Sequence, residues 1–461
     1  VSSFVGYFGL LKFGLGTSML RYVPFFRGQK DDDSVASVVN TGLTFYLFAG
    51  AAIILAAAFL ASPLTRFFGG GSDMRSLILL IGLAAAIELP MHIFDSSMKA
   101  FEAYVQPNIV DATLMIGRSV AIALALTMGY GLVALGWITF GVTGLKLIAK
   151  GIWFRQIAPT VPISLRLATP QSFRVLIGFG IVITAISMAE LLYTAMPKAI
   201  IGRTVGLEAV GVFHIAWMFT SYFRRGVRFI TSVFIPRFSF MDGRGDRSRI
   251  RELYLPSAKL VMGISGFVAS ILFVIGPPFV GLWLTNAYEN ASPVLGVLTV
   301  GTLAFTSQRL GIDMLYGLGK QRFVMALTIA DGLFAFALSL FFAFSLGLVG
   351  VAAGLAVSRV IWYGIVAPIF LCRFLDLSLF DFYFRTALPA WIIPVVMGIA
   401  AYTSGLHSLL DRWVILPFAV AAITALHLAW IYFVQFRRHE RHIVLSFVRR
   451  HRRDKPETVI G

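Results

Sequence analysis

One stretch of the sequence decides the class of fold: His214-Ile-Ala-Trp217-Met-Phe-Thr-Ser221-Tyr-Phe-Arg224-Arg225-Gly-Val-Arg228-Phe-Ile-Thr-Ser232. On a helix that turns about 100° per residue, one arc of about 80° holds His214, Trp217, Ser221, Arg224, Arg228 and Ser232, with Arg225 just beyond its edge. The rest of the circumference is mainly Ile, Val, Phe and Met. Because Arg against lipid hydrocarbon is costly, such a stripe in a membrane faces protein or water. The alternative is that these arginines only mark the cytoplasmic end of a membrane span.

The composition supports a membrane protein. The chain has 461 residues, of which 58% are hydrophobic and 13% charged, and its mean hydropathy is +0.83. These values exclude an ordinary soluble domain, and long apolar runs indicate membrane spans. The net charge of +17 is then expected to lie in cytoplasmic loops, so no nucleic-acid partner is predicted.

Sequence motifs of catalysis are absent. The single cysteine, Cys372, excludes an internal disulfide. The sequence contains no Gly-rich phosphate loop after a strand, no GxSxG, no HExxH and no Cys/His cluster with metal-ligand spacing. We therefore expect a protein that is not an enzyme and that needs no cofactor or metal.

The apolar runs predict an all-α polytopic membrane protein with thirteen visible spans. The predicted spans are residues 2–25, 41–62, 76–97, 109–130, 132–152, 175–199, 207–238, 260–284, 293–318, 323–346, 349–371, 387–402 and 413–434.

Lys and Arg alternate between rich and poor loops, which predicts the orientation in the membrane. The rich set includes Lys146 and Lys150 at the end of the fifth span, Arg21, the arginines of residues 237–251, and the C-terminal tail. We expect a multi-pass protein of the cytoplasmic membrane with its C-terminus in the cytoplasm. Thirteen spans would then place Val1 outside, so fourteen spans are expected in the intact protein, with one more helix before Val1.

An internal repeat supports this count. Sliding the first span onto the seventh by 212 residues brings Pro24 onto Pro236 and Lys12 onto Arg224, and the third and ninth spans carry Asp95 and Asp313 near corresponding ends. The repeat predicts two six-helix lobes, followed by two extra helices. The expected divisions are an N-terminal lobe that lacks its first helix (1–155), a cytoplasmic linker (156–174), a C-terminal lobe (175–373), two extra transmembrane helices (374–436) and a basic cytoplasmic tail (437–461).

Several segments resemble a known family. They are Gly9-Leu-Leu-Lys12-Phe-Gly14-Leu-Gly16-Thr-Ser-Met-Leu-Arg21-Tyr-Val23, Val210-Gly211-Val-Phe213, Phe234-Ile-Pro236-Arg237-Phe and Gly347-Leu-Val-Gly350-Val-Ala352-Ala-Gly354. They are similar to the second helix, the two ends of the eighth helix, and the entry to the twelfth helix of Wzx-like polysaccharide or lipid-linked-oligosaccharide flippases. These flippases belong to the multidrug/oligosaccharidyl-lipid/polysaccharide exporter superfamily.

The resemblance covers nearly the whole chain and implies a function. It implies two six-helix lobes around a central cavity that alternate access and move an undecaprenyl-diphosphate-linked or similar glycan to the outer leaflet. The implied partners are the lipid-linked glycan, membrane lipids and glycan-assembly proteins. The family's first helix has no counterpart in this sequence, so the resemblance assigns no residue there.

Six cationic residues lie inside predicted spans and are the candidate substrate-binding residues. They are Lys12, Arg118, Arg224, Arg225, Arg309 and Arg359. A diphosphate needs cationic donors, and the planar guanidinium fork can bind two of its oxygens. The alternative for each is a structural ion pair within the membrane.

Three acidic residues are candidates for ion coupling: Glu88, Glu190 and Asp313. Glu88 and Glu190 lack an obvious partner nearby in the sequence, and a lone carboxyl group in a span usually marks a pathway. Asp313 lies four residues after Arg309, so it either takes part in coupling or only neutralises that arginine.

Three other functions remain open. A cationic-drug exporter of the same superfamily would favour acidic rather than basic groups. A glycan polymerase or ligase would need a large external loop, whereas the external stretches here are short. A non-transporting component of a glycan-assembly complex is the third, and the basic tail could serve it, although such a tail also binds anionic lipid.

Overall fold

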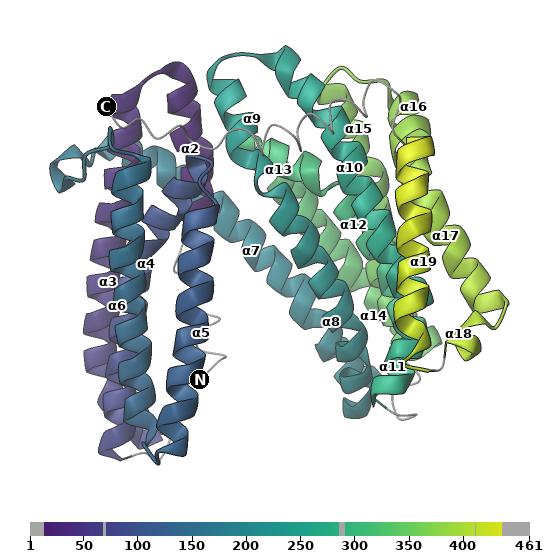
Figure 1. Cartoon of the computed structure of the whole chain (residues 1–461), viewed down its shortest axis with the longest axis horizontal. Coiled ribbons are helices and arrows are strands. Elements are labelled where there is room, and N and C mark those ends of the chain that lie inside the picture. The colour runs from purple at the N-terminus through teal and green to yellow at the C-terminus, as the bar shows by residue number, and fades with distance from the viewer. Residues whose placement is uncertain (1–12, 68–70, 285–290, 411, 436–461) are drawn as a thin grey trace. The chain divides into compact units, whose positions relative to one another are not determined.

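The structure is a computed structural model that describes residues 13–67, 71–284, 291–410 and 412–435 (Figure 1). These residues form helices joined by short connections, and no strand occurs among them. The predicted all-α fold class is therefore confirmed. The first helices are α2 (Leu15–Gln29), α3 (Asp32–Phe67), α4 (Ser72–Ala100), α5 (Val105–Thr127), α6 (Leu132–Ile157), α7 (Pro170–Thr204), α8 (Leu207–Thr231), α9 (Phe234–Gly243) and α10 (Arg247–Val274).

The remaining helices follow with shorter breaks. They are α11 (Gly276–Leu284), α12 (Ala291–Ser307), α13 (Arg309–Gly317), α14 (Gln321–Arg359), α15 (Ala367–Phe374), α16 (Leu379–Phe382), α17 (Leu388–Thr403), α18 (Leu406–Leu409) and α19 (Ile415–Trp430). Three π-helical stretches, Val360–Val366, Tyr383–Ala387 and Ile431–Gln435, continue or join these helices, and a 3₁₀ turn at Leu165–Leu167 lies before α7.

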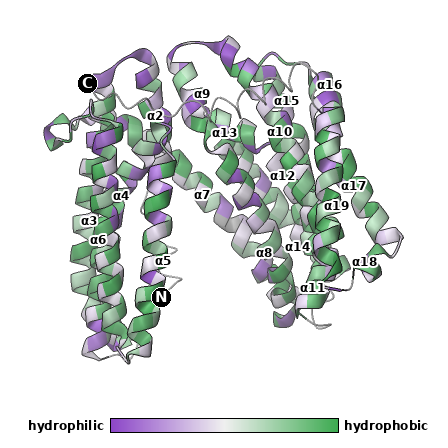
Figure 2. Cartoon of the chain, in the orientation of Figure 1, coloured by the Kyte–Doolittle hydropathy of each residue, from purple (hydrophilic) through white to green (hydrophobic). Residues whose placement is uncertain are grey.

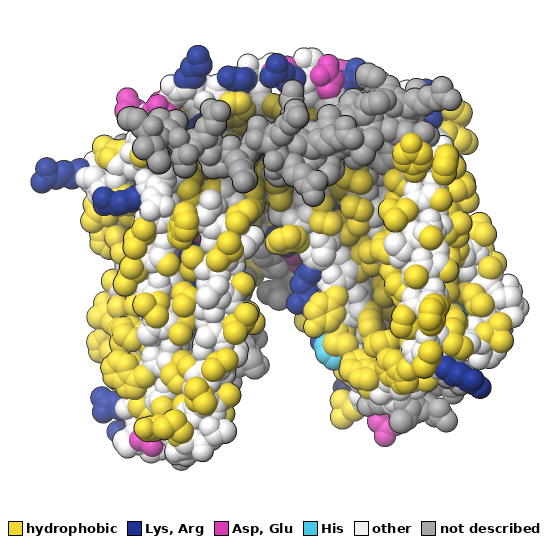
Figure 3. All heavy atoms as spheres, in the orientation of Figure 1, with side chains coloured by type: hydrophobic (Ala, Val, Ile, Leu, Met, Phe, Trp, Pro, Cys, Tyr) yellow, Lys and Arg dark blue, Asp and Glu magenta, His cyan; other side chains and the backbone are white. Residues whose placement is uncertain are grey.

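The described helices are built for a lipid environment. Nine of them are long and apolar enough to cross a membrane, counting only the described residues and judging by length and composition. Apolar residues run along the helices (Figure 2), and hydrophobic side chains cover their outer sides (Figure 3). Large apolar side chains such as Phe59 and Phe344 are about four-fifths exposed. A multi-pass membrane protein follows, while the totals of thirteen and fourteen spans stay predictions.

Several predicted spans are broken or joined in ways that hydropathy does not reveal. Span 207–238 is divided into α8 and α9, and span 293–318 into α12 and α13. Span 260–284 breaks at Ile275, just before Pro277 and Pro278, which lack the N–H that would continue a helix and suit its first turn. Spans 323–346 and 349–371 meet at a kink at Gly347, whose φ of 57° favours glycine.

The chain packs as two compact units. Unit 1 contains residues 1–187, 233–246 and 316–322, and unit 2 contains residues 188–232, 247–315 and 323–461. Among described residues, unit 1 holds α2–α6, the first half of α7, α9 and the connection between α13 and α14. Unit 2 holds the other half of α7 and the remaining helices. The domain boundaries expected from the sequence stay predictions.

The core of unit 1 is an apolar cluster around α2, α3 and α4. Met19, Val23, Val38, Ile93 and Phe154 are among its buried side chains. The core of unit 2 gathers around α8, α12 and α14, and the C-terminal helices α17 and α19 pack against α10. The burial of these apolar side chains positions the polar groups described next.

Helices α2 and α9 pack closely within unit 1. Gly28 faces the carbonyl oxygen of Phe240, and Gly243 faces that of Phe25, so neither position leaves room for a side chain. Arg21 is buried beside them and donates hydrogen bonds to the Asp242 carboxylate at 2.7 Å, to the Ser239 hydroxyl and to the Gly317 carbonyl. Arg21, which the sequence counts among the basic residues of the cytoplasmic side, thus satisfies polar groups inside the protein.

Candidate functional site

Unit 2 contains a cationic cavity of about 500 Å³. Six basic side chains line it together with a single carboxylate, that of Glu190. The basic lining residues are Lys198, Arg224, Arg225, Arg228, Arg309 and Arg359. A cavity with this lining favours an anion over a cation.

Helix α8 supplies one wall because its polar stripe lies on one face. Ser221, Arg224, Arg225 and Arg228 line the cavity, while the opposite side of α8 packs Phe213, Phe223 and Val227 into the protein. The stripe thus faces a cavity in the protein, as predicted from the helical period and from the cost of arginine in lipid.

Aromatic rings hold two of the arginines without neutralising them. The Arg224 guanidinium lies 4.4 Å from the centre of the Trp217 ring, and that of Arg225 lies 4.7 Å from the Tyr222 ring. Arg225 also donates a 3.1 Å hydrogen bond to the Ser221 hydroxyl. Cation–π contacts orient a guanidinium and leave its N–H groups and full charge for a ligand.

Arg309, in contrast, carries its own counter-ion. It pairs with Asp313 at 2.6 Å, and Asp313 is fully buried and accepts a further 2.6 Å hydrogen bond from Thr231. This geometry matches the structural alternative for Asp313, a neutralising partner of the arginine four residues earlier.

Arg359 is neutralised in a second way. Its Nε lies 3.0 Å from Asp331, an ion-pair distance without hydrogen-bond alignment, and the guanidinium lies 3.9 Å from the Tyr193 ring centre and 4.0 Å from that of Phe305. Ser358 donates a 2.8 Å hydrogen bond to Asp331. The ion pair and the rings together fix Arg359 at the edge of the cavity.

Glu190 lies on α7, in the part that belongs to unit 2, and is half-buried. Lys198, two turns further along, lines the same cavity. A carboxylate among so many cations partly offsets their repulsion and competes with an anionic ligand. Of these two residues, the sequence predicted only Glu190 as a site residue.

The structure brings five of the predicted site residues to this cavity: Glu190, Arg224, Arg225, Arg309 and Arg359. Asp313 lies behind Arg309. Lys12 lies outside the described residues, and Arg118 is on the exposed side of α5 in unit 1. The candidate list missed Arg228, Lys198 and Tyr193. The polar stripe of residues 214–232 contains Arg228. Lys198 is a charged residue near the end of the predicted span 175–199, whereas no sequence signal marks Tyr193.

Glu88 also lies in unit 1, on α4. It is within 3.2 Å of His92 Nε2, and its side chain is about half exposed. The prediction that Glu88 lacks a partner nearby in the sequence is therefore wrong, since four residues is one helical turn. Among the described residues, no group of three or more His, Cys, Asp or Glu side chains is placed to hold a metal ion.

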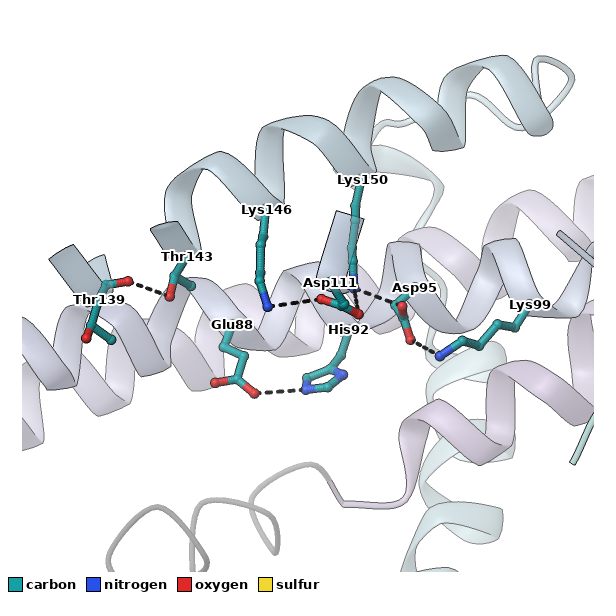
Figure 4. Close-up of polar contacts among 9 residues, drawn as sticks. All are labelled: Glu88, His92, Asp95, Lys99, Asp111, Thr139, Thr143, Lys146 and Lys150. Atoms are coloured by element: carbon teal, nitrogen blue, oxygen red, sulfur yellow. Dashed lines mark hydrogen bonds and ion pairs between the residues drawn. The ribbon is translucent and has the colours of Figure 1, made fainter. Parts of the chain in front are cut away.

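Unit 1 contains a second set of charges, drawn in Figure 4. Asp95 and Lys99 on α4, Asp111 on α5, and Lys146 and Lys150 on α6 form one network of ion pairs. Lys146 and Lys150 belong to the basic set that predicts the cytoplasmic side. Lys150 is nevertheless only 2% exposed, because α6 packs it against α4 and α5.

Comparisons with known proteins identify the class of protein. A family model described as polysaccharide biosynthesis protein matches residues 26–293. No protein of curated function matches the sequence.

The fold is similar to that of solved membrane transporters. An outward-facing multidrug resistance MATE family transporter of the MOP superfamily superposes with a TM-score of 0.70 at 17% identity, over 81% of this chain and 86% of that one. A MATE transporter in complex with MaL6 gives 0.69 at 17% identity, over 81% and 87%. A MOP superfamily transporter from Pyrococcus furiosus, described by a binding pocket of reverse polarity that suggests a different function, gives 0.68 at 17%, over 81% and 86%. The chain thus shares its fold with these solved transporters.

Proposed function

The chain belongs to the polysaccharide biosynthesis protein family, and we propose that it flips a lipid-diphosphate-linked oligosaccharide or polysaccharide precursor across the cytoplasmic membrane by alternating access. The observation that carries this proposal is the cationic cavity of unit 2, in which two arginines are oriented by aromatic rings instead of by carboxylates.

The two kinds of arginine have different roles. Arg309 and Arg359 are held by Asp313 and Asp331, so much of their charge is compensated inside the protein. Arg224 and Arg225 keep theirs for the ligand. A diphosphate offers several negative oxygens, and each charge-assisted hydrogen bond to it contributes about 1.5–3 kcal/mol.

The charge of the cavity also distinguishes this proposal from the alternative function, export of a cationic drug. A cationic drug would enter a cavity with six basic side chains and one carboxylate, where repulsion opposes binding. The similar Pyrococcus furiosus transporter, for which reverse pocket polarity suggests a different function, supports pocket charge as a guide to substrate in this superfamily.

We extend the proposal to coupling and orientation. Glu190 couples transport to a proton or metal cation, because neutralising it changes the field at Arg224 and Arg225. In unit 1, Glu88 is the candidate residue for ion coupling. The C-terminus lies in the cytoplasm, and the partners are the lipid-linked glycan, membrane lipids and glycan-assembly proteins.

Binding of a diphosphate lipid tests the proposal directly. Purified wild type and the variants Arg224→Ala and Arg225→Ala are titrated with farnesyl diphosphate and, separately, with farnesyl monophosphate. We expect each variant to bind the diphosphate about 10- to 100-fold more weakly, the loss of one charge-assisted contact. Arg251→Ala, an exposed arginine at the start of α10 outside the cavity, is the matched control and should bind like wild type.

Transport completes the test. Each variant is reconstituted in liposomes, and flipping of a fluorescent polyprenyl-diphosphate glycan is measured per correctly inserted molecule. Wild-type turnover and wild-type binding in both Arg→Ala variants would exclude the cationic cavity as the substrate site. Normal activity with poor insertion would instead mean that these arginines only anchor α8.

A further inference from the structure

The network in unit 1 centres on Lys150, which joins three helices. Its Nζ lies 2.9 Å from Asp95 Oδ1 on α4 and 2.8 Å from Asp111 Oδ2 on α5, while Lys150 itself is on α6 (Figure 4). The Lys150 side chain is 2% exposed. One buried ammonium group is therefore shared by two carboxylates.

Two further lysines complete the arrangement. Lys99 lies 2.7 Å from the second oxygen of Asp95, and Lys146 lies 3.1 Å from the second oxygen of Asp111. All four carboxylate oxygens thus have a cationic partner. Of the three lysines, only Lys150 is buried, since the side chains of Lys99 and Lys146 are 29% and 22% exposed. Figure 4 also draws Glu88 and His92, which contact each other at 3.2 Å.

Two carboxylates that converge on one buried point need a positive charge between them. The Asp95 side chain is 12% exposed and that of Asp111 is 42% exposed, so only Asp95 is poorly solvated. Without the ammonium group, repulsion between the two carboxylates would push the two helices apart or force the Asp95 carboxyl group to take up a proton. A buried charge whose partner is removed typically destabilises a protein strongly. The Lys150 ammonium group supplies this positive charge between Asp95 and Asp111.

We propose that the Lys150 ammonium is a built-in substitute for a bound monovalent cation in unit 1. It joins α4, α5 and α6 permanently, so this unit takes up no mobile metal ion at Asp95 and Asp111. The lysine also gives the carboxylates of α4 and α5 a cationic partner that does not depend on the salt around the protein. A solvated lysine that only marks the cytoplasmic side would not be buried between two carboxylates.

The test uses the full chain purified in detergent and measures its apparent Tm, so it is independent of the proposed transport. Choline chloride is compared with sodium, potassium and methylammonium chloride at equal ionic strength. Lys150→Ala should lower the Tm in choline by on the order of 5 °C. Saturable recovery is expected with at least one of the small cations, because the vacated point offers two carboxylates. In wild type, the differences in Tm between these salts should be the same as in Asp111→Asn.

Lys146→Ala is the matched control. Lys146 lies one turn before Lys150 on α6 and pairs with the same Asp111, but it is partly exposed. Its variant should show a small Tm change and no cation-specific recovery. The double variant Lys150→Ala/Asp111→Asn should be more stable in choline than Lys150→Ala, since one of the repelling charges is gone, and it should lose the recovery.

Two results would overturn the proposal. Lys150→Ala could respond equally to choline and to every small cation, which would make Lys150 a simple packing or anchoring residue. A second measurement needs no Lys150 variant: equilibrium binding of radioactive sodium and rubidium to wild type and to Asp111→Asn. We expect wild type and Asp111→Asn to bind the same number of ions per protein. A binding site that is present in wild type but lost in Asp111→Asn would show that the carboxylates hold a mobile ion, which contradicts the proposal.

Discussion

The Arg224 guanidinium lies over the ring of Trp217, which comes seven residues earlier on the same helix and therefore shares its face. Trp217 also stacks on Phe213 and lies near Tyr193, with ring centres 5.8 Å and 5.5 Å apart, so its ring cannot easily move. The arginine is thus oriented towards the cavity by an apolar platform. The ring itself orients the arginine without a carboxylate, so Glu190 is the one carboxylate among the lining residues that competes with an arriving anion.

This relationship predicts an order of affinities at position 224. Arg224→Lys keeps the charge but loses the fork, so its affinity for farnesyl diphosphate should fall between wild type and Arg224→Ala. Trp217→Leu keeps Arg224 but removes the platform, and should weaken binding about 2- to 30-fold, the range of a cation–π contact. Titration of the three purified variants checks the order. Arg224→Lys equal to wild type would mean that only charge matters at this position.

Arg21 predicts a stability effect in unit 1. Arg21→Ala leaves Asp242, Ser239 and the Gly317 carbonyl without their shared donor, so we expect the apparent Tm to fall by on the order of 5 °C. Arg27→Ala is the control on the same helix, because Arg27 lies over the Phe101 ring and its loss should change the Tm by only about 1–2 °C. Equal effects of the two substitutions in thermal unfolding would contradict a special role for Arg21.

The helix faces could be predicted from the sequence because they depend on local rules. A 3.6-residue period and the cost of arginine in lipid were enough to place Arg224 and Arg225 on a polar face of α8, and the structure brings both to one cavity. The long apolar runs likewise predicted an all-helical membrane fold, which the structure and the similar transporters confirm.

Partners across helices could not be predicted, since they depend on packing between segments far apart in sequence. Lys150 contacts Asp95, 55 residues away, and Arg359 contacts Asp331, 28 residues away. Counting charges assigned Lys150 and Arg21 to the basic cytoplasmic side and did not predict that each is buried among acceptors. Breaks such as that between α8 and α9 are also invisible to hydropathy, because both sides of the break are apolar.

The orientation predicts the side from which single cysteines react. Cys372 is the only cysteine and is buried, so it should give little background. A cysteine at Ser248, which is exposed at the start of α10, should react with a membrane-impermeant maleimide only in inside-out vesicles. One at Met128, exposed after α5, should react only in intact cells or right-side-out vesicles. Reaction of both positions from the same side would contradict the proposed topology.

Glu190 predicts how transport responds to an ion gradient. The residue is the only carboxylate among the lining residues of the unit 2 cavity, so its neutralisation increases the positive potential at Arg224 and Arg225. Glu190→Gln should therefore bind farnesyl diphosphate at least as tightly as wild type, yet lose the acceleration that an imposed proton or sodium gradient gives in liposomes. Glu208→Gln replaces an exposed acid in the first turn of α8; it is the control and should keep that acceleration.

Glu88→Gln tests the coupling candidate of unit 1 in the same assay. Gradient-driven transport at the wild-type level in both Glu190→Gln and Glu88→Gln would exclude both as coupling sites, whereas unchanged coupling with weaker diphosphate binding in Glu190→Gln would place this carboxylate in substrate binding.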